Sequence, residues 1–152
     1  GAEQTLDMDG DADFDVADRD LLAASLAPPA SATPRNGSGV NPQCLLGFTN
    51  PLLGSTWEPQ VVASGIGHPT LLWFYSAPQV GLGTAFGELL VGGARIVALS
   101  APSDGLAATY HVAIPNDAAL TGFTASVQGI IVGAPGGTQL CNALDLVLST
   151  YE

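Results

Sequence analysis

The feature that most constrains the fold is the alternation of short apolar stretches and turn residues after residue 42. The stretches recur roughly every 8 to 14 residues, are separated by Gly, Pro, Asn and Asp, and show no helical period, a spacing typical of antiparallel sandwiches. Leu144, Leu146 and Leu148 alternate with other residues, which indicates a strand with one face in a core. The predicted strands are 43–48, 57–64, 70–77, 85–91, 94–100, 107–114, 122–132 and 138–150. We therefore predict a mainly β fold, an antiparallel Greek-key-type β-sandwich.

Composition divides the chain into three segments. Residues 1–26 are acidic and end in a short helical pattern, residues 27–42 are rich in Pro, Ala and Ser, and residues 43–152 are apolar and rich in glycine. A chain of 152 residues has room for one main core and an appendage. We expect 27–42 to be an extended linker, which at ~3.1 Å per residue would reach about 50 Å. The acidic arm could then dock on its own domain or on a neighbour.

The charge distribution argues against several classes of partner. The chain has a net charge of -11 with only 3 basic residues, which disfavours nucleic acid and anionic membrane surfaces. More than half of its 14 acidic residues lie before Leu21. The negative charge is thus concentrated in residues 1–20, which indicates an electrostatic function for this segment. No apolar run approaches the ~18 to 20 residues that span a bilayer, so we expect no membrane span.

Residues 7–18 have the pattern of a calcium-binding loop. Ca²⁺ prefers six to eight oxygen ligands, which a twelve-residue loop supplies from positions 1, 3, 5, 7, 9 and 12. Phe14 lies at position 8, where an apolar residue packs the loop, and a helix with Leu21, Leu22 and Leu26 on one stripe follows. The predicted ligands are the side chains of Asp7, Asp9, Asp11 and Asp18, the carbonyl of Asp13, and Asp15 directly or through water.

Two alternatives exist for this acidic segment. A loop that begins at Asp9 would put Phe14 at the sharp turn and Ala17 at a ligand position, which makes it a worse frame. A disordered acidic tail is the common interpretation of an acid run, but it does not explain the strict alternation of aspartates or the leucine stripe. We therefore predict Ca²⁺ as the cofactor, with a structural role.

Residues 7–26 resemble one repeat of a type I dockerin, whose pattern is D-x-[DN]-x-D-G-x-[hydrophobic]-[DN]-x-x-D followed by x-x-L-L. Ala12 stands where that family has Gly, and one repeat is present where dockerins pair two. The resemblance implies an EF-hand-like calcium arm and a cohesin-like partner. A single loop and helix cannot enclose a core, so the arm needs another surface: its own β domain, a partner repeat or another subunit.

Five short motifs stand out in the β region: Asn50-Pro51-Leu52-Leu53-Gly54, Ala113-Ile114-Pro115-Asn116, Leu120-Thr121-Gly122, Val127-Gln128-Gly129 and Cys141-Asn142-Ala143-Leu144. Through these motifs the region loosely resembles C-terminal domains of secreted planctomycete and myxobacterial proteins. No activity follows from this resemblance.

The two cysteines, Cys44 and Cys141, lie at opposite ends of the β region. A disulfide between them would close a loop of nearly 100 residues, for which the chain-entropy argument gives roughly 4.7 kcal/mol of stabilisation. Two buried free thiols are the alternative. A secreted setting favours the disulfide.

We expect no enzyme. His68 and His111 are the only histidines, and neither lies beside a nucleophile motif or a third metal ligand. The carboxylates of the β region form no obvious glycosidase pair. The aromatic residues could include a sugar-stacking platform, but aromatics in sandwich strands are more often core. They are Trp57, Trp73, Phe74, Tyr75 and Tyr110.

These features favour a secreted, extracellular or cell-surface structural module whose calcium arm docks on other copies of the chain to build a polymer. The alternative is a dockerin-like or carbohydrate-binding accessory module of a larger secreted enzyme, with a cohesin-like protein or a polysaccharide as partner.

Overall fold

The computed structural model describes residues 16–134 and 137–152. This part of the chain is mainly antiparallel β-structure with a short α-helix and a 3₁₀ turn. The elements are α1 (Val16–Leu26), β1 (Ser31–Arg35), β2 (Leu45–Leu46), β3 (Thr56–Trp57), β4 (Gln60–Thr84), β5 (Gly87–Thr109), β6 (Val112–Ala113), η1 (Ala118–Leu120), β7 (Thr124–Ala134) and β8 (Gly137–Val147).

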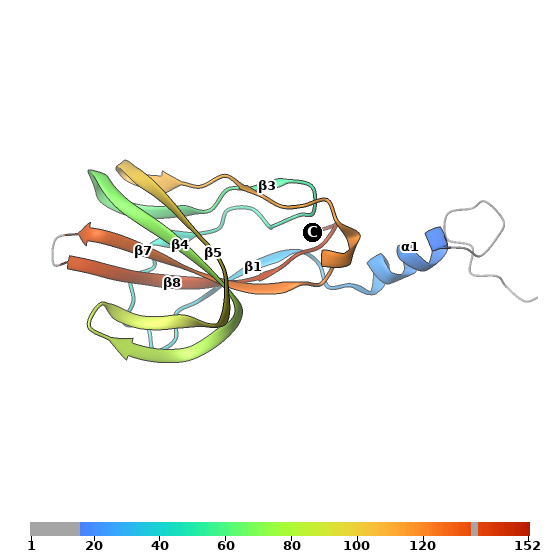
Figure 1. Cartoon of the computed structure of the whole chain (residues 1–152), viewed down its shortest axis with the longest axis horizontal. Coiled ribbons are helices and arrows are strands. Elements are labelled where there is room, and N and C mark those ends of the chain that lie inside the picture. Colours follow the sequence, from blue (N-terminus) through green and yellow to red (C-terminus); the bar gives the residue numbers. More distant parts are fainter. Residues whose placement is uncertain (1–15, 135–136) are drawn as a thin grey trace, which may run out of the picture.

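The main sheet has the order β1-β8-β7-β4-β2, and β5 also pairs with β4 (Figure 1). A ribbon of β3 and β6 lies beside it. All these pairings are antiparallel, and the first strand lies next to the last. The prediction of a mainly β, antiparallel sandwich class is confirmed.

Strands β4 and β5 are longer than the predicted strands, because each joins stretches that we expected to be separate. The turns expected between the predicted strands 85–91, 94–100 and 107–114, at Gly92-Gly93 and Ser103-Asp104-Gly105, lie inside β5. Gly93 and Gly105 have positive φ angles of 76° and 114°, and register shifts between β4 and β5 lie near both. A glycine that accepts such a φ lets a strand bulge and bend without ending. The two turn predictions are therefore wrong.

The bent hairpin of β4 and β5 covers one face of the sheet. In its distal part, Leu90 and Val91 pack against Ala143 of β8. The backbone N–H of Leu140 also donates to the carbonyl of Phe86, at 2.9 Å. Because side chains alternate along a strand, the neighbouring residues of β7 and β8 point into the main core on the other face. That core includes Trp57, Val61, Leu72, Phe74, Val127 and Leu144.

Residues 27–42, predicted to be a linker, contribute strand β1 to the sheet. β1 pairs with β8 from Ser31↔Val147 to Arg35↔Ala143. The backbone is extended as the prolines indicate, and Pro34 is tolerated because β1 is an edge strand. The structured β domain therefore begins at Ser31, which corrects the predicted boundary at residue 43.

Candidate functional site

Asp18 is the predicted calcium ligand that lies within the described chain. Asp7, Asp9, Asp11, Asp13 and Asp15 lie outside the described residues. Asp18 is in the first turn of α1, where the helix dipole favours a negative charge. It is 0% exposed, whereas the side chains of the next two residues, Arg19 and Asp20, are 67% and 60% exposed. Burial therefore singles out the carboxylate at loop position 12.

The buried carboxylate of Asp18 has an interaction partner in the structure, and a carboxylate oxygen also suits a hard cation. Removing a carboxylate from water costs several kcal/mol unless a charge or hydrogen-bond donors compensate it. Position 12 of a calcium loop supplies a carboxylate ligand, and oxygen is the donor that Ca²⁺ prefers. Among residues 16–134 and 137–152, no group of three or more His, Cys, Asp or Glu side chains could hold a metal ion.

Three apolar side chains of α1 are exposed in the described chain. Val16, Leu21 and Leu26 are 59%, 43% and 77% exposed, and the helix extends away from the sheet (Figure 1). Exposed apolar residues gathered on one element mark an interaction surface more often than scattered ones do. Leu21 and Leu26 of the predicted stripe are therefore open to solvent, whereas Leu22 is half-buried.

A second apolar surface lies at the end of the β4–β5 hairpin. Val80, Leu82 and Phe86, here called the hairpin tip, are 96%, 55% and 54% exposed. The hairpin lies at the end of the molecule opposite α1 (Figure 1). A groove of about 670 Å³ runs beside it, lined by residues 35–38, residues 78–81 and Glu88.

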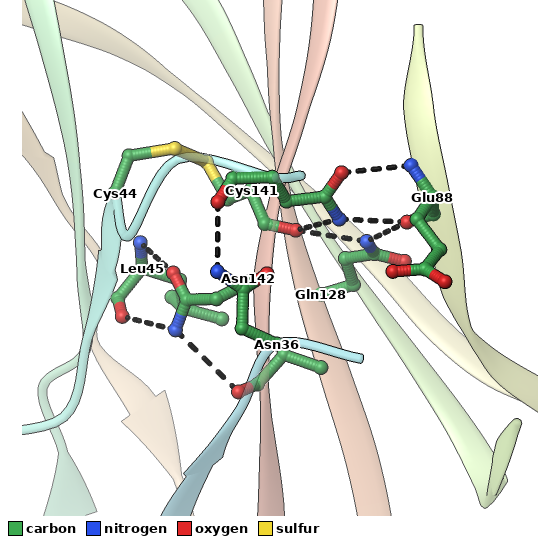
Figure 2. Close-up of a disulfide and its surroundings, with 9 residues drawn as sticks. Asn36, Cys44, Leu45, Glu88, Gln128, Cys141 and Asn142 are labelled. Atoms are coloured by element: carbon green, nitrogen blue, oxygen red, sulfur yellow. Dashed lines mark hydrogen bonds between the residues drawn. A yellow bond between two sulfur atoms is a disulfide. The ribbon is translucent and has the colours of Figure 1, made fainter. Parts of the chain in front are cut away.

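The disulfide predicted between Cys44 and Cys141 is present (Figure 2). It joins the segment before β2 to β8. Next to it, the side-chain amide of Asn142 pairs with the backbone of Leu45: Nδ2 donates to the carbonyl at 3.0 Å, and Oδ1 accepts from the N–H at 2.9 Å. The side-chain amide of Asn142 thus pairs with the backbone of Leu45 as a neighbouring strand would.

Two further amides fasten the hairpin to the sheet (Figure 2). The carbonyls of Glu88 and Cys141 each accept from both Gln128 Nε2 and Asn41 Nδ2, over 2.7 to 2.9 Å. Gln128 Oε1 also accepts from the N–H of Leu90, at 2.9 Å. Gln128 is 0% exposed, and buried bonds of this kind hold a structure rigidly. The hairpin tip is therefore presented on a fixed support.

A histidine and a carboxylate lie together at the surface of the described chain. His111 Nδ1 lies 2.8 Å from Glu58 Oε1, with side chains 68% and 53% exposed. No hydroxyl or thiol group of a described residue hydrogen-bonds to this pair. The pair is a solvated surface contact, of the kind that contributes little.

Three aromatic residues considered as a sugar platform lie in the core. Trp57, Phe74 and Tyr110 are 0%, 6% and 4% exposed. The rings of Trp57 and Phe74 pack edge to face with centroids 6.3 Å apart, and the hydroxyl of Tyr110 lies 2.6 Å from Thr70 Oγ1. Burial raises the pKa of Tyr110. Trp73 and Tyr75 are half-buried, so the five aromatics do not form one exposed platform.

Comparison with known proteins gives no relative for this chain. No protein-family model matches it, and no curated protein or solved structure is significantly similar. No helix within the described residues is long and apolar enough to cross a membrane.

Sequence reasoning predicted the disulfide from the positions of the two cysteines, and the structure confirms it. It missed Asn41, Gln128 and Asn142, because an amide within an apolar strand gives no local signal of its partner. The one signal available was that a buried amide in a strand must find partners.

Proposed function

We propose that this protein is a secreted, calcium-conditioned assembly module, whose arm folds around Ca²⁺ and docks on a neighbouring copy to build an extracellular polymer. The observation that carries the proposal is the complete burial of Asp18 on a helix whose neighbouring side chains are exposed. Together with the aspartate spacing of residues 7–18, this burial supports a calcium-loaded loop in front of α1.

The two apolar surfaces support assembly. The exposed stripe of α1 and the hairpin tip lie at opposite ends of the molecule (Figure 1). A contact between two different surfaces of identical chains is heterologous, and it continues from copy to copy unless the rotation closes a ring. If α1 of one copy docks at the hairpin tip of the next, both apolar surfaces are buried. At the two ends of such a polymer, one α1 surface and one hairpin tip remain exposed.

Calcium makes this docking conditional. The chain carries a net charge of -11, concentrated in the arm, so copies repel at low ionic strength. A bound Ca²⁺ neutralises part of the arm's charge and fixes its shape. Extracellular calcium modules bind with dissociation constants of about 10⁻⁴ to 10⁻³ M, which makes assembly responsive to millimolar calcium.

The test is sedimentation velocity and negative-stain microscopy of the full chain in millimolar Ca²⁺ and in chelator. We expect large assemblies in calcium and small species in chelator. Asp18→Asn should shift the calcium response to calcium concentrations about tenfold or more higher, and Asp20→Asn, on the same turn but exposed, is the matched control. A wild-type chain that forms no larger species in millimolar calcium than in chelator contradicts the proposal.

A second candidate function, an accessory module of a larger secreted enzyme, is favoured by the dockerin-like pattern of residues 7–26. Such a module binds a cohesin-like protein in calcium and does not polymerise alone. Calorimetry with a cohesin distinguishes the two, because a calcium-dependent complex of one to one stoichiometry supports this second function.

A further inference from the structure

The outer edge of β5 has no strand partner in the described chain. From Phe74↔Val97 to Thr70↔Ala101, β5 pairs with β4 without irregularity, and over the same stretch β7 occupies the other side of β4. Figure 1 shows β4 between β7 and β5. The sheet order places no described strand beyond β5. A row of backbone N–H and C=O groups is therefore open for pairing.

Between Val97 and Ala101 the edge lacks several devices that normally prevent pairing with another chain, namely charged side chains, Pro and β-bulges. Residues 97–101 carry no charge. Ile96 and Val97 are 48% and 40% exposed, and Leu99 and Ala101 are only partly covered where they pack on the main core. Extending the sheet at this edge would therefore bury apolar side chains as well as satisfy backbone groups.

Opposite charges flank the uncharged stretch. Arg95 is exposed and makes no hydrogen bond or ion pair with any residue of the described chain. At the other end, Asp104 Oδ1 accepts from the backbone N–H groups of Leu106 and Ala107, at 2.9 and 3.0 Å. These bonds, that of Ala107 first, lower the pKa of Asp104. The Asp104 carboxylate is thus held in place with Oδ2 available.

Arg95 and Asp104 point to the same side of the sheet. Arg95 pairs with Tyr75 and Val97 with Phe74, so β5 has one extra residue, Ile96, at this position. An inserted residue shifts the alternation of side chains by one. Without it, the odd separation between Arg95 and Asp104 would place them on opposite faces.

We infer that the β5 edge binds the β5 edge of a second copy, antiparallel about a two-fold axis at Ser100, with Arg95 of each copy beside Asp104 of the other. The pairing is self-complementary, because each copy offers the same uncharged stretch with a cation at one end and an anion at the other. Leu99 of one copy lies opposite Ala101 of the other, which joins the two cores. Pro102 falls opposite Ala98, where it can only accept a hydrogen bond.

A second copy suits this edge better than a segment rich in acid or base would. Copies with a net charge of -11 repel over most of their surface. The β5 edge brings together two uncharged strands and pairs Arg95, one of the 3 basic residues in the chain, with an acid. The dimer needs no metal, so it is independent of the calcium arm and goes beyond the proposed function.

The first test is cross-linking of the full chain in chelator, where the arm does not contribute. Ser100 is exposed, and residues directly opposite in an antiparallel ladder have Cα atoms about 4.5 to 5.5 Å apart, within the range of a disulfide. Ser100→Cys should form a covalent dimer rapidly on mild oxidation. Leu106→Cys is the control: residue 106 is 80% exposed on the same strand, but lies about 20 Å from the axis. Equal rates for the two variants overturn the inference.

The second test is the dimer dissociation constant from sedimentation equilibrium in chelator. Arg95→Asp places two acids together at each end and should weaken the dimer by about tenfold or more. Adding Asp104→Arg should restore much of the affinity, whereas Arg19→Asp should leave it unchanged. A monomeric wild-type chain, or an unaffected Arg95→Asp variant, overturns the inference. Calcium-dependent assembly is measured in a separate experiment. The β5-edge dimer and the calcium-dependent polymer can therefore be disproved independently.

Discussion

Arg35 and Asp145 bind each other across strands β1 and β8, with Nε 2.7 Å from Oδ2 and Nη2 3.1 Å from Oδ1. The same guanidinium donates to the carbonyls of Gln79 and Leu90 in the hairpin, at 3.0 and 2.6 Å. One side chain thus joins the first strand, the last strand and the hairpin that covers the sheet. These bonds use the donors of the planar guanidinium group, so Arg35 is a structural anchor and not a free anion-binding group.

Arg35→Lys should therefore be destabilising although the charge is kept. Lysine cannot reproduce the fork that serves a carboxylate and two carbonyls. With side chains 25% and 35% exposed, the loss should be about 1 to 2 kcal/mol in the free energy of unfolding. Urea unfolding measures it, with Arg95→Lys as the exposed control. Equal unfolding midpoints for the two variants would show that the fork contributes nothing.

The role of Arg35 illustrates what the sequence could predict about the fold. The apolar periodicity located most strands, because burial on one face leaves a local pattern. It could not show that residues 31–35 form a strand, since an extended proline-containing backbone has the same composition whether or not it is paired. Pairing of β1 depends on contacts with Asp145 and Ala143, more than a hundred residues away in the chain.

Gln128→Leu should loosen the hairpin. Asn41 still donates to the carbonyls of Glu88 and Cys141 in this variant, so the N–H of Leu90 is the group that loses its side-chain partner. An unsatisfied buried donor costs about 1 to 3 kcal/mol.

Hydrogen exchange should show the expected loosening as faster exchange at Leu90. Gln139→Leu, an exposed residue on the neighbouring strand, should leave both the exchange and the free energy of unfolding unchanged. Unaltered protection of Leu90 in Gln128→Leu would mean that the remaining contacts of the hairpin hold it without Gln128.

Removing the disulfide should have the largest effect on stability. Cys44 and Cys141 are separated by 97 positions, and a loop of about 100 residues gives roughly 4.7 kcal/mol in the chain-entropy argument. The double variant Cys44→Ala with Cys141→Ala should unfold at much lower denaturant concentration than the oxidised wild type. If reducing the wild type and mutating both cysteines each change the free energy of unfolding by less than about 1 kcal/mol, the disulfide is dispensable.

Stability should also fall at high pH because of Tyr110. Burial raises the pKa of its phenol, and the hydrogen bond with Thr70 opposes that shift only in part. The folded state thus keeps its proton to higher pH than the unfolded state, whose tyrosine titrates near about 10. The stabilisation of the folded state by Tyr110 is therefore fully present below the pKa of the unfolded chain. It is lost as pH rises through the pKa of Tyr110 in the folded state.

Unfolding experiments above pH ~10 check this sign. Tyr110→Phe has no phenol to titrate, so its stability should fall less steeply with pH than that of the wild type. Parallel pH profiles would assign the alkaline loss to other groups.

The candidate site was predictable only where the chemistry is local. The alternating aspartates of residues 7–18 are a local pattern, so the sequence alone could predict a cation loop there, and that loop remains a prediction. The β5 edge left no such trace. Residues 94–100 look like any sandwich strand, and nothing in their sequence says how many neighbours a strand has. Only the register with β4, and the extra residue at Ile96, bring Arg95 and Asp104 to one side.

Asp18→Asn should lower calcium affinity without unfolding the β domain. An amide offers one neutral oxygen where a carboxylate offers two charged ones, so we expect a loss of about tenfold or more in affinity. At ligand concentrations ten to a hundred times the dissociation constant, binding stabilises a folded unit by about 1.4 to 2.7 kcal/mol. Calcium should therefore slow hydrogen exchange in α1 of the wild type and of Asp20→Asn, but much less in Asp18→Asn. Isothermal titration gives the affinities directly, and a wild-type chain that releases no heat with calcium but does so after Asp18→Asn would reverse the assignment of this residue.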